Sequence, residues 1–211
     1  MKNPHGKNGA GKGRGNHQIR IIGGQWKRSL LTVTDAEGLR PTPDRVRETV
    51  FNWLNHLTDG RWERLQCLDM FAGSGALGFE AASRGAQQVV MLEQQGAACQ
   101  QMMNVKTKLK ADACQIVKTD AVLYADQAIR QGQQFDLIFL DPPFDKDWLP
   151  QVLPRCEHLL KPDGYLYIEA EYSLTPEKQD TATQDMLRGW QVLRADKAGS
   201  VHFHILQRNI S

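Results

Sequence analysis

From residue 65 onward, short apolar runs alternate with longer stretches that mix apolar and polar residues. The apolar runs read LQCLDMF, QVVMLE, CQIVKTD, FDLIFLD and GYLYIEA. The stretches between them have helical composition and cover residues 76–84, 95–110, 121–131 and 147–160. Short apolar runs that alternate with helical segments are typical of buried strands joined by crossover helices. The pattern therefore predicts an α/β fold with a mostly parallel sheet and helices on both of its faces.

The last two apolar runs, WQVLRAD and SVHFHILQ, have no helix between them. They are joined by a short link, Lys197-Ala198-Gly199, so we expect them to pair as a hairpin. Such a hairpin adds an antiparallel strand to an otherwise parallel sheet. His202 and His204 alternate with Phe203, and we interpret both histidines as structural residues on an edge strand.

Three segments precede the alternating region. Residues 1–16 are rich in Gly, Asn and Lys without a large apolar side chain, which predicts a disordered tail. The segment HQIRIIGGQWKRSLLTV alternates apolar runs around Gly23-Gly24, which predicts a β-hairpin that turns at the two glycines. Residues 43–57 place apolar side chains at helical spacing behind a proline, which predicts an amphipathic helix. We therefore expect a tail over 1–16, a hairpin-and-helix extension over 17–60 and a main domain over 61–211.

The composition is that of a soluble globular protein, with 41% apolar and 24% charged residues. No apolar run approaches the roughly 20 residues that a membrane-spanning helix needs, and the basic N-terminus lacks the apolar segment of a secretory signal. The four cysteines are scattered without metal-site spacing, which indicates reduced thiols in a cytoplasmic protein and no metal centre.

The net charge of +2 conceals an asymmetry along the chain. Residues 1–34 carry seven basic side chains and no acidic one, whereas acidic residues outnumber basic ones in the remainder. An uninterrupted basic segment is typical of contact with nucleic-acid phosphates, so the front of the chain is a candidate RNA-binding region.

A glycine-rich turn follows the first strand of the main domain, in LDMFAGSGALGFEAA. Gly73, Gly75 and Gly78 fall at G-x-G-x-x-G spacing, which allows a tight turn and a close approach of a ligand to the backbone. Dinucleotide-binding proteins share this spacing, so the glycines alone leave NAD open as a cofactor.

Acidic residues at three consecutive strand ends favour a different cofactor. Asp69 lies where it would repel a pyrophosphate but attract a sulfonium cation and an amino group. Glu93, about 20 residues further on, is suited to accept hydrogen bonds from ribose hydroxyls, and Asp120 from an adenine amino group. Together they favour S-adenosylmethionine.

The fourth strand ends in Asp141-Pro142-Pro143-Phe144. The prolines stiffen the loop and lack N–H groups, so its carbonyl groups have no local donors. Asp141 adds a carboxylate acceptor and Phe144 a flat ring for stacking. This combination predicts a receptor for a planar group that carries an NH₂.

The D-P-P-F tetrapeptide resembles the signature of methyltransferases that act on exocyclic or amide nitrogens. The stretches IRIIGGQWKRS, LRPTPDRVRETVFNWL and LDMFAGSGALGFEAASRGA closely resemble the RsmD family of bacterial 16S ribosomal RNA guanine-N2 methyltransferases. The resemblance runs from about His17 to about Leu206. It implies a class I, Rossmann-like methyltransferase fold with a seven-stranded sheet. It also implies methyl transfer from S-adenosylmethionine to N2 of a guanosine in 16S ribosomal RNA, by a cytoplasmic monomer that acts on an assembling small subunit without a metal or a membrane.

The resemblance also assigns roles to residues. The catalytic set is Asp141, Pro142, Pro143 and Phe144. The cofactor-binding set is Asp69, Phe71, Gly73, Ser74, Gly75, Glu93 and Asp120, with Thr42 and Arg45 over the methionine end. The RNA-binding set, which follows from the basic front of the chain and not from the resemblance, is Arg20, Trp26, Lys27 and Arg28. For Arg47 and Glu48, a solvated helix face is the simpler interpretation.

Two other classes of function remain open. One is an enzyme on another substrate, but a protein glutamine methyltransferase usually carries Asn at position 141, and a DNA enzyme needs a larger target-recognition region. The other is a non-catalytic RNA-binding or assembly factor, against which the intact acids Asp69, Glu93, Asp120 and Asp141 argue.

Overall fold

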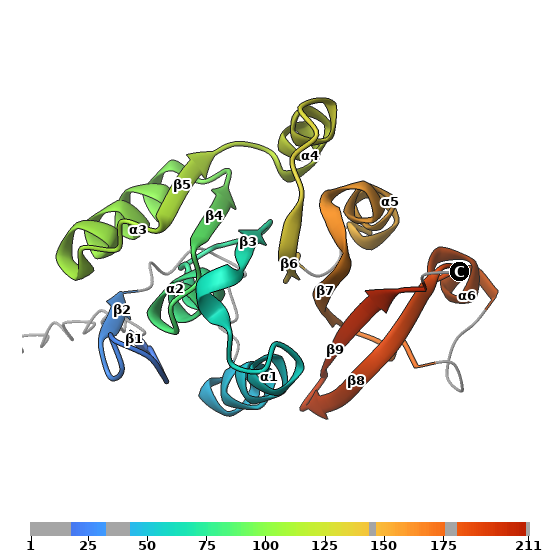
Figure 1. Ribbon diagram of the computed structural model, residues 1–211, viewed down its shortest axis with the longest axis horizontal. Helices are drawn as coiled ribbons and strands as arrows, with labels where there is room; N and C mark the ends of the chain where they lie inside the picture. Colours follow the sequence, from blue (N-terminus) through green and yellow to red (C-terminus); the bar gives the residue numbers. More distant parts are fainter. Residues whose placement is uncertain (1–17, 33–42, 144–146, 176–180, 210–211) are drawn as a thin grey trace, which may run out of the picture.

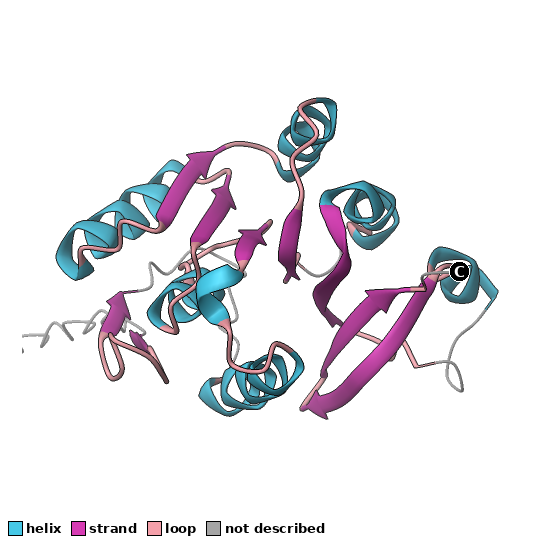
Figure 2. Ribbon diagram, in the orientation of Figure 1, coloured by secondary structure: helices cyan, strands magenta, loops and turns pink. Residues whose placement is uncertain are grey.

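The computed structural model describes residues 18–32, 43–143, 147–175 and 181–209. The expected tail over 1–16 and the site residues Thr42 and Phe144 lie outside these ranges. Within the described residues, nine strands form one seven-stranded sheet and one two-stranded sheet, and helices connect most of the strands (Figures 1 and 2).

The small sheet pairs β1 (Gln18–Arg20) with β2 (Leu30–Thr32) in antiparallel register. The large sheet has the strand order β5-β4-β3-β6-β7-β9-β8. Its strands are β3 (Gln66–Asp69), β4 (Gln88–Glu93), β5 (Cys114–Lys118), β6 (Phe135–Leu140), β7 (Leu160–Ala170), β8 (Trp190–Ala198) and β9 (Val201–Arg208). Strands β3 to β7 are parallel, and β9 runs antiparallel to both β7 and β8, so the predicted mixed sheet is confirmed.

The helices cover both faces of this sheet, as predicted. They are α1 (Asp44–Leu57), α2 (Ala76–Ser83), α3 (Gly96–Leu109), α4 (Ala121–Arg130), α5 (Leu149–Leu159) and α6 (Thr181–Met186), with a 3₁₀ turn at Trp62–Arg64. Side chains of α1, α2 and α3 share one buried cluster, and those of α4 and α5 share the other. Successive residues of β6 alternate between the two clusters, because side chains point to opposite faces along a strand.

The chain order of the strands reverses beside β3, which has β4 on one side and β6 on the other. In open α/β sheets, ligands bind at such a switch point, outside the carboxyl ends of the strands. The carboxyl ends of β3 and β6 therefore mark the place where the site is expected.

Two predictions about local structure need correction, and one element was missed. The hairpin does not turn at Gly23-Gly24: its strands stop at Arg20 and resume at Leu30, and the loop between them is held by contacts with α2. Strand β9 is not an edge strand, because β8 lies outside it. The short helix α6 had no counterpart in the predicted pattern.

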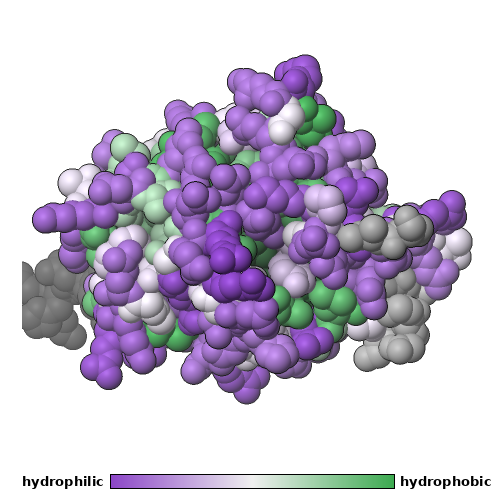
Figure 3. All heavy atoms as spheres, in the orientation of Figure 1, coloured by the Kyte–Doolittle hydropathy of each residue, from purple (hydrophilic) through white to green (hydrophobic). Residues whose placement is uncertain are grey.

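The surface seen in Figure 3 is mostly hydrophilic, with apolar residues in scattered places. Among the described residues, no helix combines the length and apolar character that crossing a membrane requires.

The pH dependence of folding should reveal the buried histidine of β9. His204 is 1% exposed, and its Nε2 accepts a hydrogen bond from the Leu174 N–H at 3.1 Å. Burial lowers the pKa of His204 to about 4, so the folded state holds the neutral ring. The unfolded chain gains a proton below pH 6.5, and stability should therefore fall by about 3 kcal/mol as the pH drops from 6.5 to 4. Urea unfolding across this range measures the loss. A His204→Gln variant should show a smaller loss, and equal losses would contradict the role of this residue.

Candidate active site

Asp69 ends β3 and lies in the buried centre of the candidate site. Its side chain is 1% exposed, and its Oδ2 accepts a hydrogen bond from the Gly78 N–H at 3.1 Å. Its Oδ1 is buried without a hydrogen-bond partner among the described residues. Burial raises the pKa of Asp69 to about 7, against the opposing effect of its backbone hydrogen bonds. A buried acceptor without a donor is costly, so this atom points to a ligand that donates.

The glycine loop between β3 and α2 has the geometry that its sequence predicts. Gly75 has a φ of 79°, and a Cβ there would lie 2.7 Å from the ring of Phe79. Gly78 has no such φ, but a Cβ would lie 2.4 Å from the sulfur of Met91 on β4. The turn therefore requires Gly75, and the close packing of α2 on the sheet requires Gly78.

Glu93 ends β4 and connects this strand to the glycine loop. Its Oε2 accepts from the Gly73 N–H at 3.0 Å and its Oε1 from the Gln95 N–H at 2.8 Å. Each carboxylate oxygen can accept more than one hydrogen bond, so the side chain retains capacity for the hydroxyls of a ligand. The half-buried carboxylate is thus held in place before a ligand arrives.

Asp120, after β5, is the N-cap of α4. Its Oδ1 accepts from the N–H groups of Val122 and Leu123 at 2.9 and 3.0 Å, and its Oδ2 accepts from the side-chain amide of Gln94. Asp120 therefore caps α4, a role that the sequence analysis did not assign to it. Oδ1 makes both capping hydrogen bonds, and Oδ2 faces Gln94 in the loop after β4.

Asp141 follows β6 and is half-buried, with Pro142 buried and Pro143 exposed. Across the β6–β7 ladder, Leu140 pairs with Ile168, so Asp141 comes opposite Glu169. The O–H of Tyr167 donates to Glu169 Oε1 at 2.7 Å. Burial, Glu169 and Asp141 together raise the pKa of Tyr167 far above its usual value, which indicates that the two carboxylates lie near one phenol. Sequence reasoning missed Glu169, whose only signal was an acid inside the apolar run GYLYIEA.

The strand order brings these acids together. Asp69 on β3 lies between the ends of β4 and β6, so Glu93 is on one side of it and Asp141 on the other. Neighbouring strands are about 4.8 Å apart, so the three carboxylates line one short edge, with Asp120 beyond Glu93. Phe71 is half-buried and contacts Trp148 edge-on, with ring centroids 5.2 Å apart.

This set of acceptors fits the cofactor expected from the sequence. S-adenosylmethionine carries an ammonium, a sulfonium, two ribose hydroxyls and an adenine amino group, all of which are positive or donate hydrogen bonds. The unpartnered Oδ1 of Asp69 matches the ammonium, whereas the carboxylates at the ends of β3 and β4 would repel a phosphate-bearing dinucleotide.

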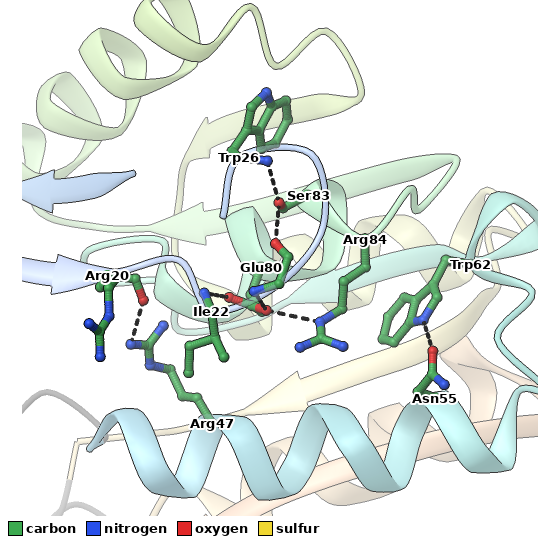
Figure 4. A network of polar contacts seen from close by, with 10 residues as sticks. Arg20, Ile22, Trp26, Arg47, Asn55, Trp62, Glu80, Ser83 and Arg84 are labelled. Carbon is green, nitrogen blue, oxygen red and sulfur yellow. Dashed lines mark hydrogen bonds and ion pairs between the residues drawn. The ribbon is translucent and has the colours of Figure 1, made fainter. Parts of the chain in front are cut away.

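The N-terminal hairpin is held on the far end of α2 (Figure 4). The N–H groups of Ile22 and Gly23 donate to the carboxylate of Glu80 at 2.7 and 2.8 Å, and the Trp26 N–H donates to Ser83 Oγ at 3.0 Å. Glu80 is fully buried and also pairs with Arg84 at 2.9 Å. These contacts position the expected RNA-binding loop, and the only sequence signal for them is an acid in the apolar stretch ALGFEAAS.

The prediction of a solvated face for Arg47 is wrong. Its side chain is completely buried, and its Nη2 donates to the Arg20 carbonyl at 2.9 Å and to Asp44 Oδ1 at 2.5 Å. Arg47 therefore connects α1 to β1 (Figure 4). Arg20, Lys27 and Arg28 are exposed and Trp26 is half-buried. Ser74 in the glycine loop is half-buried, whereas Arg45 lies in a hollow beside the C-terminal hairpin.

Comparison with known proteins adds family information to this geometry. The profile of the family described as conserved hypothetical protein 95 matches residues 19–207. Ribosomal RNA small subunit methyltransferase D of Escherichia coli K12 is 39% identical over 92% of each chain. A solved structure, the putative methyltransferase yhhF from Escherichia coli, superimposes with a TM-score of 0.75 at 35% identity, over 92% of this chain and 100% of that one.

A more distant structure shows likeness of fold alone. It is a Thermus thermophilus 16S rRNA N2 G1207 methyltransferase, solved in complex with AdoMet and guanosine. It superimposes with a TM-score of 0.64 at 20% identity, over 92% of this chain and 50% of that one. The predicted methyltransferase fold is therefore confirmed.

Cofactor affinity should depend on the protonation of Asp69. Without a ligand, its carboxyl keeps a proton up to about pH 7. A bound cation favours the ionised form, so affinity for S-adenosylmethionine should rise as the pH increases from 5.5 to 7.5, with proton release on binding. Calorimetry in buffers of different ionisation enthalpy counts the released protons. An Asp69→Asn variant should bind more weakly at pH 7.5 and release fewer protons, and an unchanged proton count would contradict this assignment.

The Glu80 carboxylate should be the main anchor of the hairpin. Removing it in Glu80→Ala leaves two backbone N–H groups and the Arg84 guanidinium without their acceptor, which should cost about 3–5 kcal/mol. Hydrogen exchange at the amides of Ile22 and Gly23 should accelerate, and urea unfolding measures the loss in stability. Glu48→Ala, on the exposed face of α1, is the matched control and should change neither. A loss below about 1 kcal/mol in Glu80→Ala would mean that other contacts hold the hairpin.

Proposed function

The chain belongs to the conserved hypothetical protein 95 family, and on this premise we propose that it transfers a methyl group from S-adenosylmethionine to the exocyclic N2 of a guanosine in 16S ribosomal RNA. The observation that carries the proposal is the sequence identity of 39%, over 92% of this chain, with ribosomal RNA small subunit methyltransferase D of Escherichia coli. The Asp141-Pro142-Pro143 loop at the end of β6 supports it.

The cofactor is held by the acids of the first three strand ends. Asp69 accepts from its ammonium group, Glu93 from the ribose hydroxyls and Asp120 from the adenine amino group. The turn at Gly73, Ser74 and Gly75 lets it approach the backbone, and Phe71 packs beside it. When bound, S-adenosylmethionine supplies a methyl group made electrophilic by the sulfonium.

The residues after β6 make the guanine nitrogen reactive. The lone pair of N2 is delocalised into the purine, so the amine is a poor nucleophile. Asp141 and the carbonyl of Pro142 each accept one N–H, which favours a tetrahedral nitrogen with its lone pair directed away from both acceptors. Holding the nitrogen in one position between these two acceptors would remove most of the remaining entropic cost. Asp141 is also placed to take the proton that the nitrogen loses after transfer.

The RNA must present an unpaired or extruded base to this loop. Stacking on Phe144, which lies outside the described residues, would offset part of that cost. Arg20, Lys27 and Arg28 bind RNA phosphates, and Trp26 lies between them for contact with a base or ribose. In this proposal the protein acts in the cytoplasm as a monomer on an assembling small subunit.

Methyl transfer from labelled cofactor onto small subunits that lack the modification tests the function. Nucleoside analysis of the RNA should find the label in N2-methylguanosine. Asp141→Ala should lower kcat by about 10²–10³-fold because it removes an acceptor that acts on the reacting nitrogen, while the cofactor dissociation constant stays nearly unchanged.

Glu171→Ala provides a nearby control for this experiment. It removes an exposed carboxylate just after β7, two residues from Glu169, and therefore reports whether any acid at this strand end matters. Glu63→Ala, in the 3₁₀ turn before β3, is the distant control and should leave both values intact. Label in another nucleoside or in protein would overturn the function, and equal loss of cofactor binding in Asp141→Ala would give Asp141 a structural role.

A further inference from the structure

A hollow of about 250 Å³ lies between the first turns of α1 and the tip of the β8–β9 hairpin. Figure 1 shows these two elements side by side, although about 150 residues separate them in the sequence. The charged and polar residues that line the hollow are Arg45, Thr49, Asp196 and Lys197, and Phe203 lines it from the sheet. Neither the glycine loop nor the acids at the ends of β3, β4 and β5 contribute to it.

The strand register relates the hollow to the candidate active site. Asp196 pairs with Phe203, and Phe203 pairs with Glu169, which comes opposite Asp141. Registered partners project from the same face, so these side chains form one row across the sheet on the face that α1 covers. Two strand spacings separate Phe203 from Asp141, or about 10 Å. Asp69, on β3, is one strand further away.

Two cations from different elements meet at this hollow. Arg45 and Lys197 are both exposed, and neither forms an ion pair with another described residue. Arg45 lies in the first turn of α1, a helix of 14 residues whose N-terminal dipole adds positive potential. The carboxylate of Asp196 opposes them, although its Oδ1 accepts from the backbone N–H of Lys197 at 2.7 Å.

The N-terminal hairpin reaches the first turn of α1 close to the hollow. Arg20 on β1 donates to Asp44 Oδ2 at 3.1 Å, and Asp44 is the residue before Arg45. An extended anionic strand that contacts the hairpin can therefore continue along the first turn of α1 into the hollow.

We propose that this hollow binds a backbone phosphate of the RNA strand next to the target guanosine, with Arg45 and Lys197 as its ligands. The proposal rests on the proposed function and deepens it. The sequence resemblance assigns Arg45 to the methionine end of the cofactor. The hollow that Arg45 lines, however, lies beside β9, which is three strand spacings, or about 14 Å, from the strand that carries Asp69. The hollow lies on the substrate side of Asp141, and a phosphate there fixes the position of the strand without reading its sequence.

A salt titration of binding to an unmodified 16S ribosomal RNA transcript tests the proposal. Arg45→Gln and Lys197→Gln should each weaken RNA binding several-fold and reduce the slope of log affinity against log salt by about 0.7, the value for one lost phosphate contact on a single strand. The cofactor dissociation constant should not change in either variant. The matched controls are Arg130→Gln and Lys108→Gln, which remove exposed cations at the ends of α4 and α3, two helices that do not line the hollow. Both variants should leave the phosphate contacts in the hollow intact. The RNA affinity should stay within about twofold of the wild type, because the attraction by one distant surface charge is screened.

A third variant distinguishes phosphate binding from damage to the hollow. Asp196→Asn removes the opposing charge and keeps an oxygen for the Lys197 N–H, so RNA binding should become tighter. Slopes equal to the wild type in both cation variants, or looser binding in Asp196→Asn, would overturn the subsite. Weakened cofactor binding in Arg45→Gln would also overturn it and return Arg45 to the cofactor. If the wild-type protein neither binds the transcript nor methylates small subunits, the proposed function itself fails.

Discussion

The buried carboxylate of Glu80 is the interaction on which the arrangement of the two halves of the site depends. It accepts from two N–H groups of the hairpin loop and from Arg84, so its negative charge is neutralised inside the protein. The guanidinium of Arg84 lies over the ring of Phe51 at 5.1 Å, which extends the connection to α1. Helix α2 begins at the glycine loop and ends at this anchor. One short helix therefore sets the distance between the cofactor loop and the basic hairpin, and a buried charge with three donors makes that distance rigid.

The parts of the fold that sequence could predict are those governed by local pattern. The strands from β3 to β7 and the helices between them follow from apolar runs and their spacing, and α1 follows from its helical periodicity. The loop after β1 could not be read in this way. Gly24 looks like half of a tight turn, but it is required because a Cβ there would lie 1.8 Å from the carbonyl oxygen of Ser83 on α2. The position of β9 inside the sheet is likewise a tertiary choice, since a hairpin can join a sheet through either of its strands.

The same division applies to the candidate site. Its cofactor side comes from consecutive strand–loop units, so Asp69, Glu93 and Asp120 could be identified from their places after apolar runs. The substrate side is assembled from β6, β7, the C-terminal hairpin and α1, which no local spacing connects. For this reason Glu169 beside Asp141 emerges only from the register of the sheet, and Arg45 beside Lys197 only from the packing of α1 on the C-terminal hairpin. Arg47 shows the limit most clearly, because a charged residue on a helix is ordinarily exposed and this one is completely buried beneath β1.

The distribution of charge explains how an acidic site can accept an anionic substrate. The carboxylates of Glu93 and Asp141 line the edge where the reaction is proposed, and they repel phosphate from it. The cation Arg45 lies in the hollow beside β9, two strand spacings from Asp141, and Arg20 reaches the same turn of α1 through its ion pair with Asp44. A nucleic-acid strand is therefore attracted to the flank and excluded from the centre, while a neutral base is not repelled. The only part of an RNA that can enter the acidic edge without an electrostatic penalty is an extruded base that offers N–H donors, and the exocyclic amine of guanine is such a group.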